Sequence, residues 1–262
     1  MRYADRVVVV TGGSRGIGEG VVRAFVREGA TVVAVSNDQD GGEAVAAALG
    51  PTCTHAFADV RREEALAATI ASVIERHGRI DCLVNNAGTH FAHRPIDAIT
   101  VSEFRELLDL NLVSQFTACR LALPHLRQAR GNIINMASLV ATVGQACAVD
   151  YVASKGAIVA FTKALAIDEA RHGVRVNCVS PGNIDTPLWQ SFADASVDPD
   201  AIRAEGAAAQ WLPRLGTSDE VGRLCVYLAA EATYTTGVDH VISGGAELGY
   251  GSKPAGAPGG PG

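Results

Sequence analysis

Short apolar runs recur along the chain and alternate with segments of helical periodicity. The clearest runs are rich in β-branched residues, which is typical of buried strands; they are Val7–Val10, Thr31–Val35, Cys82–Asn85, Ile133–Met136 and Arg175–Val179. Weaker strand patterns cover Thr52–Phe57 and His240–Ile242. The pattern therefore predicts about seven strands.

Apolar positions three and four residues apart predict helices between these strands. Leu66, Ile70 and Val73 share one face of the segment 63–77, and a similar stripe runs through 151–171. Alternating strands and helices favour a parallel sheet with helices on both faces. We therefore expect a doubly wound, Rossmann-like α/β fold in three layers.

One segment breaks the alternation. Residues 185–215 are long and mixed and contain three prolines, and such segments in a compact domain are usually lids or binding loops. We expect a single catalytic domain over residues 1–250 with a substrate lid at about 185–215. The stretch 251–262 is rich in Gly, Pro and Ala, which predicts a flexible tail.

Composition excludes several classes of function. The chain has 262 residues, of which 48% are apolar and 19% charged, and a net charge of −6, as in a globular enzyme. It has no basic run for nucleic acid, no apolar stretch that spans a membrane and no signal peptide at its start. We expect a small-molecule substrate, with neither nucleic acid nor membrane as a partner.

The cysteines and histidines predict no metal site. Six cysteines stand at wide, irregular intervals without a C-x-x-C pair, which indicates buried free thiols in a reducing compartment, the cytoplasm. His90 and His93 form an H-x-x-H, but no further ligand stands at a suitable spacing.

A glycine-rich loop directly follows the first strand. Glycines allow a tight turn and a close approach of the backbone, and the next helix offers free N–H groups to a pyrophosphate. The spacing is G-x-x-x-G-x-G rather than the common G-x-G-x-x-G. The position between strand and helix predicts dinucleotide binding by Gly12, Ser14, Arg15, Gly16, Ile17 and Gly18.

The end of the second strand bears on the choice between NAD and NADP. An acidic residue there binds the ribose 2′-hydroxyl of NAD, whereas this chain has Ser36 and Asn37, with Asp38 one step later. Arg15 is suited to a 2′-phosphate. Ser36 and Arg15 favour NADP, unless Asp38 turns inwards.

Asp59 and Val60 follow the third strand candidate and suit an adenine ring. The carboxylate would accept from the exocyclic amine, and Val60 would pack on the ring. The alternative for Asp59 is a helix N-cap.

Tyr151 and Lys155 stand four residues apart, which places them on one face of a helix. A nearby ammonium lowers the pKa of a phenol towards the working range, so Tyr151 would exchange a proton with a substrate oxygen. The alternative is a core tyrosine beside a lysine that reaches solvent.

Several ordered motifs together resemble the short-chain dehydrogenase/reductase family. Besides the glycine loop and the Tyr151–Lys155 pair, they are Asn85-Asn86-Ala87-Gly88, Asn111 within a long helix, Ser138, and Pro181-Gly182. Residues 180–189 and 244–251 are most similar to the type 14 17β-hydroxysteroid dehydrogenases, a group also linked to L-fucose oxidation. Relatives in that group use NAD and carry an acidic residue in place of Ser36 and an aromatic one in place of Asp185.

The resemblance implies a role for each catalytic residue. Tyr151 would donate or accept the proton, Lys155 would bind the nicotinamide ribose and lower the pKa of Tyr151, and Ser138 would hold the substrate oxygen. Asn111 would support a water that links Lys155 to solvent, or would be a polar residue satisfied locally. The backbone of Ile184 and the side chain of Thr186 would bind the carboxamide, and the remaining cofactor contacts would be Asn86, Gly88, Pro181, Gly182 and Leu188.

The substrate pocket is expected to include His90, Gln145 and Trp189. Trp189 and Phe192 have the alternative of forming the core of the lid. The resemblance also implies a homodimer or homotetramer, in which Tyr250 would reach a neighbouring subunit's site.

Three functions agree with these residues. The first is an NAD(P)-dependent oxidoreductase that interconverts a secondary alcohol and a ketone, with a steroid or sugar hydroxyl as substrate. The second is a 3-oxoacyl-thioester reductase. The third, from another class, is a dinucleotide-binding sensor or scaffold without turnover.

Overall fold

Seven parallel strands form the main sheet of the computed structural model, which describes residues 1–91 and 93–248. Their order is β3-β2-β1-β4-β5-β6-β9, and every neighbouring pair is parallel. The strands are β1 (Val7–Thr11), β2 (Thr31–Ser36), β3 (Cys53–Phe57), β4 (Cys82–Asn85), β5 (Asn132–Met136), β6 (Arg175–Pro181) and β9 (Asp239–Ile242). The predicted doubly wound α/β fold is confirmed, and Tyr250 and the expected tail 251–262 lie outside the described residues.

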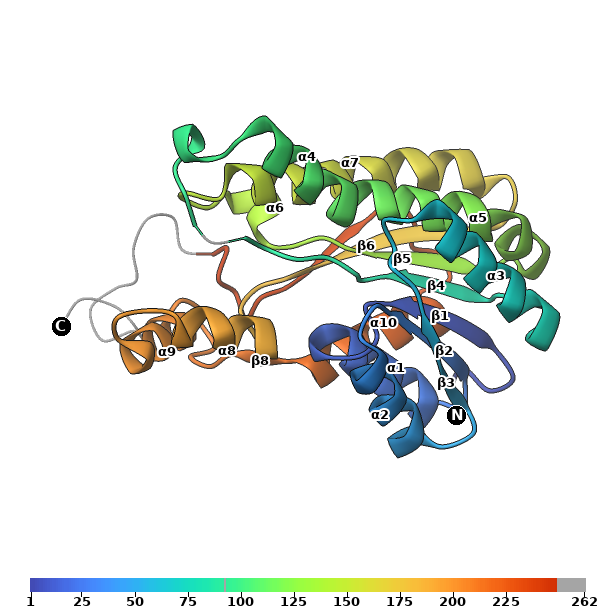
Figure 1. Cartoon of the computed structure of the whole chain (residues 1–262). Helices are drawn as coiled ribbons and strands as arrows, with labels where there is room; N and C mark the ends of the chain where they lie inside the picture. Colours follow the sequence, from blue (N-terminus) through green and yellow to red (C-terminus); the bar gives the residue numbers. More distant parts are fainter. Residues whose placement is uncertain (92, 249–262) are drawn as a thin grey trace.

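Helices cover both faces of the sheet (Figure 1). One layer consists of α1 (Gly16–Arg27), α2 (Gln39–Leu49) and α10 (Ser218–Ala230), and the other contains α3 (Glu63–His77), α4 (Val101–Leu108), α5 (Ser114–Ala129) and α7 (Val149–Ala170). Shorter segments are the 3-10 turn η1 (Ile96–Ala98) and α6 (Val140–Val143).

The alternating side chains of β1 supply two cores, one on each face. Val8 and Val10 pack with Phe25 beneath α1 and α10, whereas Val7 and Val9 pack with the opposite helices. Successive side chains of a strand point to opposite faces, so an uninterrupted apolar run is what a sheet covered on both sides requires. The sheet is therefore held rigidly, and its carboxyl edge is a fixed platform for loops.

A short π-helical turn, η2 (Asp109–Val113), interrupts the expected long helix at Asn111. It joins α4 to α5, so one long periodic segment becomes three consecutive helical pieces. π-turns of this kind are frequent at functional sites.

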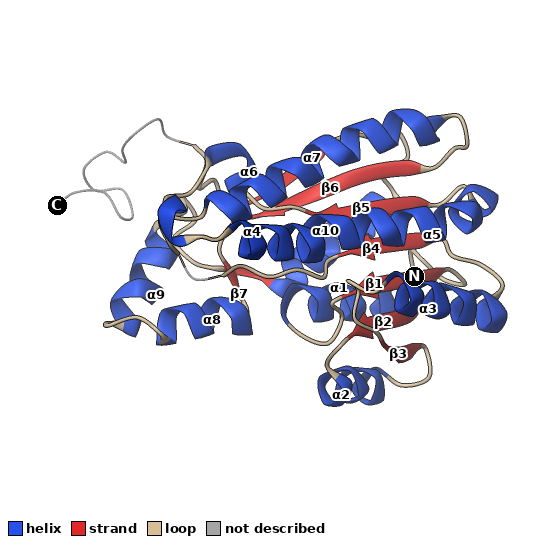
Figure 2. Ribbon diagram, turned by 45° about the horizontal axis from the view of Figure 1, so that its top comes forward, coloured by secondary structure: helices blue, strands red, loops and turns tan. Residues whose placement is uncertain are grey.

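The segment 185–215 contains two helices that the sequence pattern did not indicate. They are α8 (Pro187–Asp194) and α9 (Pro199–Ala208), and they project beyond the carboxyl edge of the sheet (Figure 2). A two-stranded sheet of β7 (Ile184–Asp185) and β8 (Gly216–Thr217) joins the two ends of this excursion. Each helix begins at proline after a capping Thr186 or Asp198, a favoured arrangement for helix starts.

Two further findings concern cysteines and membranes. All six cysteines are free thiols, but Cys147 is exposed, which corrects the expectation that they are all buried. In the described ranges, no helix is both long enough and apolar enough to traverse a bilayer.

Candidate active site

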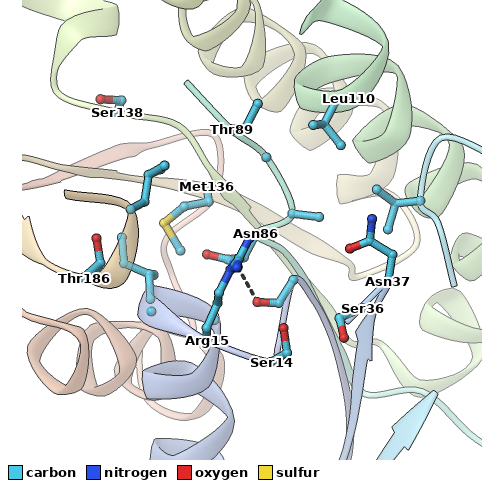
Figure 3. A pocket seen from close by; sticks show the side chains of 18 of the residues that line it. Ser14, Arg15, Ser36, Asn37, Asn86, Thr89, Leu110, Met136, Ser138 and Thr186 are labelled. Atoms are coloured by element: carbon cyan, nitrogen blue, oxygen red, sulfur yellow. Dashed lines mark hydrogen bonds between the residues drawn. The ribbon is translucent and has the colours of Figure 1, made fainter. Parts of the chain in front are cut away.

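A cleft of about 500 Å³ lies along the carboxyl edge of the sheet. Figure 3 looks into it: Ser36 and Asn37 lie at one end, Ser138 and Thr186 at the other, and Arg15 and Asn86 between them. The cleft is lined by all the predicted cofactor residues except Ile184: Gly12, Ser14, Arg15, Gly16, Ile17, Gly18, Ser36, Asn37, Asp59, Val60, Asn86, Gly88, Tyr151, Lys155, Pro181, Gly182, Thr186 and Leu188.

The glycine loop brings backbone very close to backbone. A side chain at Gly18 would place its Cβ 1.9 Å from the carbonyl oxygen of Gly12, so only glycine fits there. Gly12 and Gly16 adopt positive φ angles of 66° and 57°, which other residues rarely tolerate. Arg15, the N-cap of α1, makes no side-chain capping bond, so N–H groups of the first turn remain available to an anion.

Asn86 fixes the glycine loop to the loop after β4. Its Nδ2 donates to the carbonyl oxygens of Thr11 and Gly12 at 3.1 and 3.2 Å. The Thr11 hydroxyl accepts in turn from the backbone N–H groups of Asn86 and Ala87. Asn86 thus holds the glycine loop in its shape. The sequence did not predict this contact.

The Asp38 carboxylate is used as a helix cap. Its Oδ1 accepts from the Gly41 N–H at 3.0 Å at the start of α2, although Asp38 still lines the cleft. Arg15 is exposed and forms no ion pair with any described residue. The cleft therefore carries a free guanidinium between its two ends.

Asp59 pairs with Arg61 through hydrogen bonds of 2.7 to 3.1 Å. These bonds hold the pKa of the carboxyl below its usual range. The alternative of a helix N-cap is wrong, because α3 begins at Glu63 with Arg62 as its cap.

A second cleft of about 410 Å³ meets the first at Ser138 and Tyr151, which line both. All three predicted substrate residues line it: His90 from the loop after β4, Gln145 after α6, and Trp189 from α8. Ile184 lines this cleft rather than the first. An alcohol bound in the second cleft would thus lie next to Tyr151, which separates it from the first cleft.

Burial shifts the pKa values of both Tyr151 and Lys155. Burial raises the pKa of the Tyr151 phenol, and hydrogen bonding with Ser138 lowers it in part. Burial also lowers the pKa of Lys155 to about 8. The Lys155 Nζ donates to the carbonyl oxygen of Met136 at 3.0 Å and lies 5.6 Å from the centre of the Tyr151 ring. Lys155 is buried, so the alternative of a lysine that reaches solvent is wrong, but the predicted lowering of the Tyr151 pKa is absent from this arrangement.

Asn111 is fully buried and joins two elements of the site. Its amide pairs with Thr89, accepting from N–H at 2.9 Å and donating to the carbonyl at 3.0 Å, and it donates to Ser154 Oγ at 3.1 Å. Ser154 immediately precedes Lys155 on α7. Asn111 lines neither cleft, so its position fits the local, positioning alternative.

An aromatic row extends from Tyr151 across the second cleft. His90 lies 4.3 Å from Tyr151, His93 lies 4.9 Å from His90, and Phe192 lies 5.1 Å from His93, measured between ring centres. Burial and the neighbouring His93 lower the pKa of His90 to about 4. The Nε2 atom of His90 is buried without a hydrogen-bond partner, so it is free for a ligand.

Trp189 packs on α9 and lines the second cleft at once. Its ring packs so closely on Gly206 of α9 that a Cβ there would lie 2.4 Å away, and it also lines the second cleft. Phe192, which is exposed, lines the same cleft. The two roles expected for Trp189, contact with the substrate and packing within the segment 185–215, are therefore compatible.

Several residues of the site were missed by sequence reasoning. Phe91 lines both clefts, Ser154 connects Asn111 to α7, and His55 contacts Ser36. The position of Phe91 between Gly88 and His93 was a usable signal, whereas the other two contacts depend on tertiary structure.

Among the described residues no cluster of three His, Cys, Asp or Glu side chains suits a metal ion.

Comparisons with known proteins agree with this geometry. A family model described as enoyl-(acyl carrier protein) reductase matches residues 12–247. L-fucose dehydrogenase of Bos taurus is 52% identical over 262 residues, covering 98% of this chain and 97% of the relative.

Two solved structures share the fold. Aldohexose dehydrogenase of Thermoplasma acidophilum superposes with a TM-score of 0.88 at 32% identity, covering 96% of this chain and 98% of the other. A 3-ketoacyl-(acyl-carrier-protein) reductase of Brucella melitensis complexed with NADH gives 0.85 at 28% identity, covering 94% and 100%. The chain therefore belongs to the short-chain dehydrogenase/reductase family and is an oxidoreductase that acts on a CH–OH group with NAD or NADP as acceptor.

Proposed function

We propose that this enzyme oxidises a ring hydroxyl of a small sugar of the L-fucose class. The observation that carries the proposal is the shared wall of the two clefts, where Ser138 and Tyr151 face both. The similarity to sugar dehydrogenases supports a sugar over a steroid. The cleft is lined by Trp189 and Phe192, which suit the C–H side of a ring, and by His90 and Gln145, which suit its hydroxyls.

The proposed reaction requires one proton acceptor and one hydride acceptor. Ser138 holds the reacting hydroxyl, and the Tyr151 phenolate accepts its proton while the carbon–hydrogen bond breaks and the carbonyl forms. The bound nicotinamide supplies the hydride acceptor. In the proposed reaction Lys155, as a cation, would stabilise the phenolate, although in the present geometry only Ser138 lowers the pKa of Tyr151. The network of Asn111 and Ser154 holds the helix that carries both residues.

The residues of the first cleft fit a dinucleotide. The free N–H groups at the start of α1 suit its pyrophosphate. For the adenosine ribose we propose a 2′-phosphate, hence NADP, paired with the free guanidinium of Arg15. This preference is opposed by the NAD use implied by the resemblance, and the NADP/NAD ratio of kcat/KM in wild type and Arg15→Ala tests it.

We propose that α8 and α9 form a lid over the substrate within a single catalytic domain. The packing of Trp189 on Gly206 couples the two helices, and β7 with β8 provides a fixed base. Segments of this kind exclude water and complete the binding site.

We also propose a homodimer or homotetramer in the cytoplasm. Phe116 on α5 and Ile167 on α7 are apolar side chains exposed at 51% and 78%, and exposed apolar side chains of this kind are suited to an association surface. The free thiols agree with a reducing compartment. Sedimentation of the purified chain tests the oligomer.

A second candidate is reduction of a 3-oxoacyl thioester, because a 3-ketoacyl reductase shares the fold across 94% of this chain. Such a substrate needs an open path for a long chain, whereas a sugar fits a cleft of about 410 Å³.

A turnover panel tests the proposal. L-fucose, other aldohexoses, estradiol and a 3-hydroxyacyl thioester are supplied with NAD and with NADP, and absorbance of the reduced nicotinamide is followed. We expect sugars to give the highest kcat/KM. Faster turnover of the thioester would favour the second candidate, and faster turnover of estradiol would favour a steroid enzyme.

A further inference from the structure

The last residue of β2, Ser36, is buried and its hydroxyl is fully engaged. Its Oγ donates to the carbonyl oxygen of Asp38 at 3.0 Å and lies 3.0 Å from Nε2 of His55 on β3. Ser36 lines the cleft where the adenosine ribose would bind, yet its hydroxyl is bonded to the turn and to His55.

The Ser36 hydroxyl is shared between the turn and His55. It bonds to the Asp38 carbonyl and accepts from the Asp38 N–H at 3.4 Å, and its third contact is Nε2 of His55. The Nε2–H tautomer of His55 donates to Ser36, and the other tautomer accepts from it. With either tautomer the bond joins β3 to the turn at the end of β2.

The ring of His55 lies in a space that only glycine leaves open. A Cβ at Gly42 of α2 would come within 2.2 Å of the imidazole. The ring thus lies between β3 and α2, and its Nε2 reaches Ser36 at the end of β2. Together, the His55 bond and the Asp38 cap on Gly41 fix the turn 36–38 on both sides.

The fixed turn determines how Asn37 and Asp38 are presented to the cleft, and Arg15 enters the same cleft from the glycine loop. The Asp38 carboxylate is held at the start of α2, Asn37 is exposed, and the Arg15 guanidinium is without an ion pair in the described part of the chain. A guanidinium and an amide together suit a phosphate, whereas a ribose hydroxyl pair is best bound by a free carboxylate.

We propose that His55 is a positioning residue for cofactor selection. Through its hydrogen bond with Ser36 it keeps the turn 36–38 in the shape that leaves Arg15 and Asn37 to a 2′-phosphate and holds the Asp38 carboxylate as the cap of α2. This inference rests on the proposed NADP preference and assigns the residue that maintains it.

Binding of two adenosine fragments to the full-length chain tests the inference without turnover. The probes are 2′,5′-ADP, which carries the 2′-phosphate, and 5′-AMP, which lacks it, measured by calorimetry. In wild type we expect 2′,5′-ADP to bind about tenfold tighter, or 1.4 kcal/mol. In His55→Phe we expect that ratio to fall about fivefold or more, with the affinity for 5′-AMP changed less than about twofold.

Matched variants separate selection from general damage. His55→Gln retains an N–H donor and should keep most of the ratio, and Ser36→Ala, which removes only the hydroxyl, should lose it as His55→Phe does. His77→Phe replaces another histidine, on α3, and should change nothing.

Three results would overturn the inference. Equal losses for both probes in His55→Phe would show a merely structural role, and an unchanged ratio in both His55→Phe and Ser36→Ala would show that the hydrogen bond is irrelevant. Tighter binding of 5′-AMP than of 2′,5′-ADP by wild type would remove the NADP preference itself, while sugar oxidation with NAD would still stand.

Discussion

The imidazole of His90 lies against the ring of Tyr151, with ring centres 4.3 Å apart. Its pKa of about 4 makes it neutral at pH 7, and its Nε2 is buried without a partner. A neutral imidazole can bond to a substrate hydroxyl without adding a positive charge beside the phenol. His90 is therefore suited to orient a sugar and not to exchange its proton.

Replacement of His90 by phenylalanine tests this role. The ring contact with Tyr151 is retained and the hydrogen bond is lost, so KM for the sugar should rise about tenfold, the value of one hydrogen bond, with kcat changed much less. Steady-state kinetics on His90→Phe and on the control His77→Phe measure the effect. A fall in kcat at constant KM would instead assign His90 to the chemical step.

The pH profile of oxidation depends on Lys155. The reaction needs deprotonated Tyr151, whose pKa burial raises, so kcat/KM for oxidation should increase as pH rises from about 6 to 9. Lys155, with a pKa of about 8, is a cation in the lower part of this range, and its proposed role is that this charge favours the phenolate.

In Lys155→Met the rise in kcat/KM should move to higher pH by about one unit or more, because the opposing charge is gone. Lys163→Met removes an exposed lysine from the same helix and should leave the profile in place. A profile that is identical in wild type and Lys155→Met would exclude an electrostatic role for this ammonium.

The amide of Asn111 and the hydroxyl of Ser154 should be energetically coupled. Asn111→Ala leaves the N–H and carbonyl of Thr89 without their side-chain partner and removes the N–H donated to Ser154 Oγ, which should lower the free energy of unfolding by about 2 kcal/mol. Ser154→Ala should cost about 1 kcal/mol, and the double variant less than the sum. Urea denaturation measures all three, and strict additivity would show that the two side chains act independently.

Much of the fold was predictable because period-two and period-3.6 patterns survive in the sequence. The segments 82–85 and 63–77 match β4 and α3 at both ends. The glycine loop was recognisable because its position between strand and helix carries the chemistry.

The rest depended on contacts that no local pattern encodes. The π-turn at Asn111 has the same apolar periodicity as an α-helix, so the interruption was invisible. His55 meets Ser36 only because β3 and β2 pair in a particular register. The helices α8 and α9 are capped by Thr186 and Asp198, but with eight and ten residues they are too short for a periodic pattern to stand out.

The glycine loop provides a test of cofactor binding alone. Gly18→Ala would place a methyl group 1.9 Å from the Gly12 carbonyl oxygen, so the loop must shift and dinucleotide affinity should fall by about tenfold or more. Gly156→Ala is the matched control, because its Cβ meets nothing within 4 Å. Calorimetry with NADP and NAD checks both variants, and wild-type affinity in Gly18→Ala would refute the close approach.

Transfer of deuterium from a sugar to the cofactor tests the central claim most directly. L-fucose deuterated at every ring carbon is incubated with the enzyme and NAD(P), and the deuterium content of the reduced cofactor is measured by mass spectrometry. We expect one deuterium in each reduced cofactor formed by wild type, and about a hundredfold less product from Tyr151→Phe despite unchanged cofactor affinity. Reduced cofactor without deuterium, or equal product from Tyr151→Phe, would contradict hydride transfer from a sugar carbon assisted by Tyr151.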